Sequence, residues 1–173
     1  MDDDALFERL CLEGFQSGLS WLTILRKRPA FREAFAGFRI DDVAGFGARD
    51  VRRLLGDAGI VRNRQKIEAT IANARAAAEL RDNGESLTAL VWGAAPHGRR
   101  RAPRCTADLP ATTPESTALS RELKRRGFRF LGPTTVYATM QACGVVNDHV
   151  LGCVVRGEVE RQRRAALATV PRA

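Results

Sequence analysis

Residues 54–67 have the sequence Leu54-Leu55-Gly56-Asp57-Ala58-Gly59-Ile60-Val61-Arg62-Asn63-Arg64-Gln65-Lys66-Ile67. A short glycine-containing turn separates two segments of helical character, and cations open the second segment. Gly59 can take a positive φ that other residues resist, and the free amides at the next helix N-terminus can then face a phosphate oxygen. The stretch therefore resembles a helix-hairpin-helix element.

The turn supplies five candidate contacts to a nucleic-acid backbone. Amides of the turn and cations at the start of the second helix would both face phosphate oxygens. These candidates are Gly59, Ile60, Arg62, Arg64 and Lys66. An ordinary corner between two helices, with a solvated basic face, accounts for the same residues equally well.

Helical periodicity extends on both sides of this stretch. It is strongest from Asn63 to Arg81, where apolar residues recur at helical spacing and Asn83-Gly84 supplies a stop. No run alternates apolar and polar residues convincingly, so we expect an all-α fold. Further helices are expected over residues 5–28, 30–38, 48–57, 116–126 and 134–143, and a brief helix capped by Asp41.

Two segments lack this periodicity. Residues 94–114 are rich in Pro, Arg, Gly and Thr and include Arg99-Arg100-Arg101, a composition typical of an exposed loop. After Arg156 the chain is basic and Ala-rich. We therefore expect one domain over residues 1–155, followed over residues 156–173 by a basic, flexible tail or a frayed helix.

Composition narrows the class of protein. A chain of 173 residues that is 45% hydrophobic suits a compact domain. Its formal net charge of +8 and its isoelectric point of about 10.3 favour a polyanionic partner, with nucleic acid as the leading class. Nearly all of the positive charge is Arg, a bias that a GC-rich genome also produces.

The N-terminus and the cysteines bear on the compartment. Met1-Asp2-Asp3-Asp4 lacks the basic and apolar regions of a secretion signal, and no run of about 18 apolar residues occurs. We expect a cytoplasmic protein with no membrane contact and no obligate protein partner. The cysteines are far apart, which favours reduced thiols over a disulfide framework. They are Cys11, Cys105, Cys143 and Cys153.

A second candidate cluster lies in Leu12-Glu13-Gly14-Phe15-Gln16-Ser17-Gly18-Leu19-Ser20-Trp21. Glu13, Ser17 and Trp21 follow i, i+4, i+8 spacing along one face of the expected helix. A flipped purine can stack on the indole, while the carboxylate accepts hydrogen bonds from the base edge and favours positive charge on it. The alternative is a solvated Glu13 with Trp21 in the core.

A third cluster contains His149 and Cys153 at i, i+4, a spacing that can direct an imidazole and a thiolate at one zinc ion. Two ligands are half of a structural site. A buried cysteine with a hydrogen-bonded histidine fits the spacing at least as well, and Cys105 or His97 are the remaining candidates for further ligands.

Taken in order, these segments resemble the DNA-3-methyladenine glycosylases of the constitutive bacterial type, within the helix-hairpin-helix glycosylase superfamily. The resemblance covers residues 2–155. It rests on the Leu12–Trp21 run, on Asp57-Ala58-Gly59-Ile60-Val61-Arg62, on Lys124-Arg125-Arg126-Gly127-Phe128-Arg129-Phe130, and on Met140-Gln141-Ala142-Cys143-Gly144 with Asn147-Asp148-His149.

The resemblance implies a two-lobed helical fold whose cleft accepts 3-methyladenine. Glu13 would contact the damaged base and serve as the candidate catalytic residue, with Ser17 and Trp21 in the base pocket. His149 and Cys153 would be half of a structural zinc site. In the family the other two ligands, a Cys and a His, come from a segment that would precede Met1, so we expect an N-terminally truncated domain.

The implied activity is monofunctional hydrolysis of the N-glycosidic bond in alkylated double-stranded DNA, which leaves an abasic site. Methylation at N3 makes the base cationic in DNA, so it departs neutral from a weakened bond. No lysine is placed as a Schiff-base nucleophile. Two other classes stay open: a DNA-binding remnant without activity, and a helical scaffold whose charge is only compositional.

Overall fold

The structure is a computed structural model that describes residues 2–96, 98 and 101–170. Within these ranges it contains helices and no strand, which confirms the all-α prediction. The helices are α1 (Asp3–Gln16), α2 (Trp21–Ala34), α3 (Ile40–Ala44), α4 (Ala48–Gly56), α5 (Arg64–Asp82), α6 (Leu87–Gly93), α7 (Pro114–Arg125), α8 (Pro133–Ala142) and α9 (Arg156–Thr169), with short 3-10 turns at Ala36–Phe38 and Thr106–Asp108.

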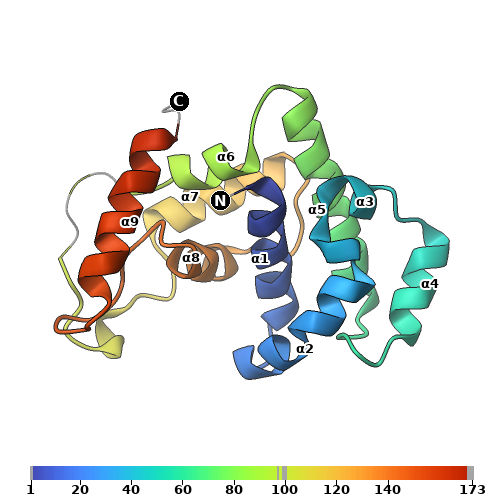
Figure 1. Cartoon of the computed structure of the whole chain (residues 1–173), viewed down its shortest axis with the longest axis horizontal. Coiled ribbons are helices and arrows are strands. Elements are labelled where there is room, and N and C mark those ends of the chain that lie inside the picture. The colour runs from blue at the N-terminus through green and yellow to red at the C-terminus, as the bar shows by residue number, and fades with distance from the viewer. Residues whose placement is uncertain (1, 97, 99–100, 171–173) are drawn as a thin grey trace.

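Helix α1 runs through the middle of the molecule (Figure 1). Helices α2 to α5 gather on one side of it and α6 to α9 on the other, an arrangement that matches the two lobes expected from the resemblance. None of the described helices is both long and apolar enough to cross a membrane.

Phenylalanines form the core between α1, α2 and the turn that follows α2. The Phe15 and Phe31 ring centroids lie 4.6 Å apart, and those of Phe35 and Phe38 lie 5.4 Å apart. All four side chains are fully buried. Each such ring removes a large apolar area from water, so this cluster fixes the angle between α1 and α2.

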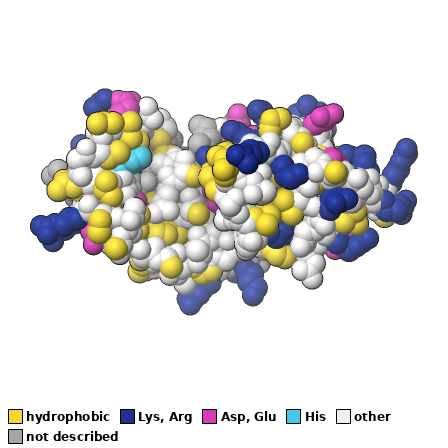
Figure 2. All heavy atoms as spheres, turned by 90° about the horizontal axis from the view of Figure 1, so that it is seen from below, with side chains coloured by type: hydrophobic (Ala, Val, Ile, Leu, Met, Phe, Trp, Pro, Cys, Tyr) yellow, Lys and Arg dark blue, Asp and Glu magenta, His cyan; other side chains and the backbone are white. Residues whose placement is uncertain are grey.

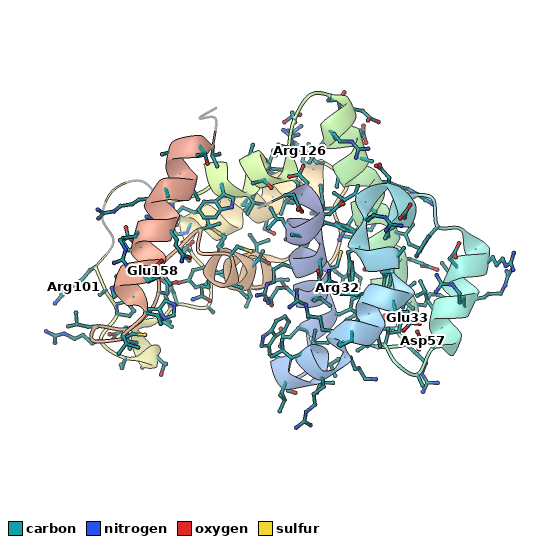
Figure 3. All side chains as sticks on the ribbon, in the orientation of Figure 1. Arg32, Glu33, Asp57, Arg101, Arg126 and Glu158 are labelled. Atoms are coloured by element: carbon teal, nitrogen blue, oxygen red, sulfur yellow. The ribbon has the colours of Figure 1, made fainter. Side chains whose placement is uncertain are left out.

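Ion pairs between a buried carboxylate and two half-exposed arginines add a second link between the same two helices. Glu8 on α1 is 5% exposed and accepts a hydrogen bond of 2.7 Å from Arg28 on α2. Arg32, one turn further along α2 (Figure 3), lies 3.6 Å from the other Glu8 oxygen. The two cations neutralise a carboxylate that burial alone would disfavour.

The prediction of one helix over residues 5–28 is wrong, because a loop between Gln16 and Trp21 separates two helices. Gly18 has φ +82°, a conformation that ends the helix, and Ser20 caps α2 by accepting from the Thr23 amide. Pro29 was expected to begin another helix. It lies instead inside α2, which ends at Ala34, and residues 36–38 form a 3-10 turn.

Helix α6 lies inside no predicted segment. Its first amides are capped from a distant part of the chain: the Asp3 carboxylate accepts hydrogen bonds from the Leu87 and Thr88 amides at 3.0 and 2.8 Å. Asp41 likewise was expected to cap α3. It lies in the first turn of α3, and its carboxylate pairs with Arg81 on α5.

Residues 156–169, expected as a flexible tail or a frayed helix, form α9. Arg163 connects α9 to the rest of the molecule, because its Nε donates to the Val145 carbonyl at 2.8 Å and its side chain is 11% exposed. Ala166, Leu167 and Val170 pack partly against the core. The described part of this segment is therefore a docked helix.

The α4–α5 turn, residues 57–63, is shaped by close approach rather than by an unusual φ. Gly59 does not have the positive φ that we expected; a Cβ at this position would lie 2.9 Å from the Ala30 Cβ and 2.9 Å from Asp57 Oδ1. Asp57, in the turn below α4 (Figure 3), accepts the Gly59 amide at 2.7 Å. Only glycine fits where the turn touches α2.

We expect Gly59→Ala to lower the free energy of unfolding by about 1–3 kcal/mol, because the added methyl group meets Ala30 and Asp57. The matched control is Gly56→Ala at the end of α4, where a Cβ meets nothing within 4 Å. Denaturant unfolding of both variants measures the difference, and Ala30→Gly should restore part of the loss. Equal stability of the two variants would contradict this account.

Candidate active site and nucleic-acid interface

Glu13 lies in the last turn of α1, where only 6% of it is exposed. Burial raises the pKa of its carboxyl group, and the charge of Arg9, one turn earlier, partly opposes that rise. The carboxylate forms no hydrogen bond or ion pair with another described residue. A buried carboxyl group without such a partner is costly and is typical of a binding or catalytic site.

Trp21 opens α2 on the far side of the break, and Arg9 connects it to Glu13. The Arg9 guanidinium carbon lies 5.3 Å from the centre of the Trp21 ring, a cation–π distance. The same Arg9 charge acts on the Glu13 carboxyl group. Arg9 therefore links Glu13 and Trp21 indirectly, across the break between α1 and α2 rather than along one continuous helix face, and the shared base pocket stays a prediction.

Ser17 differs from the prediction in both position and contacts. It is the C-cap of α1, exposed to solvent, and its carbonyl accepts a hydrogen bond of 2.6 Å from Lys66. The helix ends before Ser17 can share a helical face with Glu13. Its place in the base pocket stays a prediction.

The end of α8 faces the same region of α1. Cys143, the C-cap of α8, has its thiol pKa raised to about 11, first by burial and then by the charge of Glu13, with Arg9 acting in the opposite direction. Nearby, Tyr137 and Gln141 donate hydrogen bonds to the Asp148 carboxylate, Gln141 at 3.0 Å. Helix α8, which is distant from α1 in sequence, therefore contributes to the surroundings of Glu13.

Lys66 connects the α4–α5 turn to this site. Its ammonium donates to the carbonyls of Phe15 and Ser17 at 2.9 and 2.6 Å, and burial lowers the pKa of Lys66. These carbonyls belong to the end of α1, where acceptors lack intrahelical partners. The structure thus directs Lys66 toward α1, whereas we expected a phosphate contact.

The turn itself leaves some of its predicted donors available. The amide of Gly59 donates to the Asp57 side chain and that of Ile60 to the Asp57 carbonyl, so both are occupied. The amides of Val61 and Arg62 have no acceptor within the described part of the chain. Of the five predicted contacts, Arg62 and Arg64 are exposed cations here, and Arg64 also pairs with Glu68 at 3.2 Å.

Lys and Arg side chains gather on the end of the molecule that carries α2 and α4 (Figure 2). Lys27 on α2 binds the α4–α5 turn at this end, because its ammonium donates to the carbonyls of Ala58 and Gly59 at 2.8 and 3.1 Å. The two helices carry six exposed arginines, of which Arg28 and Arg32 also pair with Glu8. They are Arg26, Arg28 and Arg32 on α2 and Arg49, Arg52 and Arg53 on α4. This surface has the charge that a phosphate backbone requires.

His149 and Cys153 form a pair and no more. Cys153 Sγ lies 3.4 Å from His149 Nδ1, a hydrogen-bond contact, and no three His, Cys, Asp or Glu side chains among the described residues are grouped to hold a metal. Cys105 is exposed in the loop before α7, and His97 lies outside the described residues, as do Arg99 and Arg100. Two ligands do not fit a tetrahedral zinc site, and the zinc stays a prediction.

The described residues form an all-helical protein with a buried carboxylate on α1 and a basic turn between α4 and α5. The family model for methyladenine glycosylase matches residues 1–156. DNA-3-methyladenine glycosylase 1 of Escherichia coli (strain K12) is 48% identical over 153 residues, which are 88% of this chain and 82% of that protein. The chain belongs to the methyladenine glycosylase family.

Solved structures agree with this assignment. A crystal structure of 3-methyladenine DNA glycosylase I matches with a TM-score of 0.85 and 45% identity, covering 88% of this chain and 85% of that one. A variant of 3-methyladenine DNA glycosylase I in complex with 3-methyladenine matches with a TM-score of 0.84 and 35% identity, covering 90% and 84%. The family and the all-α fold predicted from the sequence are confirmed.

Burial of Glu13 predicts that Glu13→Gln stabilises the protein at neutral pH. Its folded-state pKa lies above the ordinary value of 4.5, so the stability contributed by the protonated form is lost as pH rises through the folded pKa. Gln carries no charge and escapes this loss. The melting temperature of Glu13→Gln, relative to the wild type, should therefore rise between pH 4 and pH 8.

The control is Glu79→Gln, which removes an exposed carboxylate from α5. It should change the melting temperature by nearly the same small amount at every pH. If the difference in melting temperature between Glu13→Gln and the wild type did not change with pH, ionisation of the buried carboxyl group would not lower the stability of the protein.

Proposed function

We propose that this chain is a DNA repair glycosylase that hydrolyses the N-glycosidic bond of 3-methyladenine in alkylated double-stranded DNA. The observation that carries the proposal is the buried Glu13 carboxylate, which has no hydrogen-bond or ion-pair partner among the described residues and is influenced by the charge of Arg9, the cation that lies over the Trp21 ring. A relative of the same fold binds 3-methyladenine. Because the proposed substrate is DNA, we also propose that the enzyme acts in the cytoplasm, on chromosomal DNA.

The position of Arg9 supports a cationic ligand. Its guanidinium is planar and delocalised, as is a purine methylated at N3 and still attached to the sugar. Both suit a place over an aromatic face and beside a carboxylate. In this proposal the flipped base stacks on Trp21 and Glu13 binds its edge, favouring the positive charge that weakens the glycosidic bond.

The remaining steps need little from the protein. As the bond breaks, its electron pair goes to the base, which departs neutral, and water adds to the sugar C1′ and loses a proton. The abasic site is the product. Glu13 is the residue we assign to base recognition.

We further propose that α4, the turn and α5 form a helix-hairpin-helix that binds the phosphate backbone. The available amides of Val61 and Arg62 and the exposed cations Arg62 and Arg64 would contact phosphate oxygens. Lys66 would act indirectly, by fixing the turn relative to the end of α1.

Glu13→Gln should lower the rate of 3-methyladenine release from methylated duplex DNA at least ten-fold, because a neutral amide stabilises a cationic base less than a carboxylate does. Chromatography of the released free base measures the rate. Binding to an undamaged duplex should be nearly unchanged. An unaffected rate would contradict the role of Glu13, and a wild-type protein that binds DNA without releasing base would be a binding remnant.

Replacing Arg62 and Arg64 by Ala should weaken binding to all duplex sequences alike. Each lost phosphate contact reduces the slope of log K against log salt by about 0.9, so the double variant should lower the slope by about 2. The matched control, Arg161→Ala with Arg164→Ala, removes two exposed arginines from α9. Equal slopes for the two double variants would reject the hairpin as the binding surface.

A further inference from the structure

Phe130 has a backbone conformation that a phenylalanine rarely adopts. It lies in the connection between α7 and α8 with φ +58°, in the left-handed region that favours glycine. The strain of such a residue must be offset by its surroundings, and residues of this kind concentrate at functional sites.

Comparison with Phe38 shows that core packing does not account for Phe130. Phe38 also has φ +58°, but its ring is fully buried and contacts Phe35 at a centroid distance of 5.4 Å. Phe130 is 43% exposed. The strained backbone of Phe130 thus holds a large aromatic ring partly in water, where the ring gains less from burial.

The residues on either side of Phe130 are fixed by side-chain hydrogen bonds. Asn73 on α5 accepts the Arg129 amide at 2.6 Å and donates to the Arg129 carbonyl at 3.1 Å. Ser120 on α7 donates to the Leu131 carbonyl at 2.7 Å. Two helices therefore impose the conformation of the loop, and the ring is held in place before any ligand binds.

Phe130 lies between the base site and the α4–α5 turn. Its carbonyl and Cβ are 3.7 and 4.0 Å from the point where Gly14 would carry a Cβ, and Gly14 directly follows Glu13. Phe130 and Lys66 line the same small cavity between α1 and α5. The connection from α7 to α8 passes alongside α1 and α5 at this point (Figure 1).

We propose that Phe130 is a DNA-positioning residue, whose ring stacks on a nucleobase of the damaged strand next to the flipped one. This inference rests on the proposed function. The neighbouring exposed Arg129 supplies positive charge, and an exposed aromatic beside cations is the usual composition of a surface that binds unstacked bases. The strained loop keeps the ring ready to replace the stacking that flipping removes.

The test uses a duplex that carries a tetrahydrofuran abasic-site analogue, so that no base occupies the Glu13 pocket. Phe130→Ala should weaken binding to this duplex about ten-fold, as expected for losing one base–aromatic stack. The slope of affinity against salt should stay unchanged, because the ring carries no charge. Phe130→Trp should keep the affinity, and Leu151→Ala, which truncates a side chain that is 68% exposed, should have no effect.

Free 3-methyladenine, titrated by tryptophan fluorescence, provides the second readout. Phe130→Ala should bind it as the wild type does, and a parallel loss would overturn the proposal in favour of a ring that shapes the pocket. A Phe130→Ala variant that binds the abasic duplex as tightly as the wild type does would also overturn the proposal. If Phe130→Ala unfolds, Phe130→Gly decides, since glycine accepts the positive φ without strain. If the wild type released no base, the proposed enzyme activity would be rejected. The comparison of duplex affinities between the wild type and Phe130→Ala would still test the role of Phe130.

Discussion

The hydrogen bonds of Lys66 are the interaction on which the arrangement of the functional residues depends. Its ammonium satisfies the carbonyls of Phe15 and Ser17, which end α1 one turn beyond Glu13. Because Lys66 also lies in the first turn of α5, one side chain sets the distance between the buried carboxylate and the basic turn. Without it, the exposed loop from Ser17 to Ser20 would lose the hydrogen bond that connects it to α5, and the two parts of the site would be free to shift. The partial burial of the ammonium is offset by two good acceptors.

The sequence predicts the long, periodic helices well and fails where contacts between distant residues decide. Helix α5 begins after Asn63, which caps it, and ends at Asp82, one residue beyond the predicted Arg81 and directly before the expected stop at Asn83. Helix α6 was missed although Ser86 caps it locally, because the helix is only seven residues long and part of its N-terminal hydrogen bonding comes from Asp3, more than 80 residues away. Lys66 looked like a phosphate ligand for the same reason: nothing in the local sequence shows that the end of α1 lies beside it. Glu13 and Trp21 were selected from residue type, and the continuous helix assumed to join them is broken at Gly18.

Glu13 and Phe130 each depart from a common rule of protein folding. One is an ionisable group buried with no partner among the described residues, and the other is an aromatic ring exposed on a strained backbone. Each lowers stability locally, and each is held by neighbours whose own bonding is complete, as Asn73 shows for the loop of Phe130. Local violations of folding rules that are supported by a satisfied scaffold are what a preorganised site requires.

The placement of the charged residues matters more for DNA binding than their number. The formal charge of +8 suggested nucleic acid, yet several cations serve the fold. Arg75 donates to the carbonyls of Ala44 and Phe46, Arg126 pairs with Glu85 and Glu122, and Arg163 is nearly buried against Val145. Such arginines are already satisfied and contribute little to DNA affinity. The relevant quantity is the set of exposed cations around residues 57–63, where α2, α4 and the start of α5 converge. A homogeneous basic surface would bind duplex DNA anywhere along the protein, whereas cations concentrated at a turn that Lys66 ties to the end of α1 bind it in one register relative to Glu13.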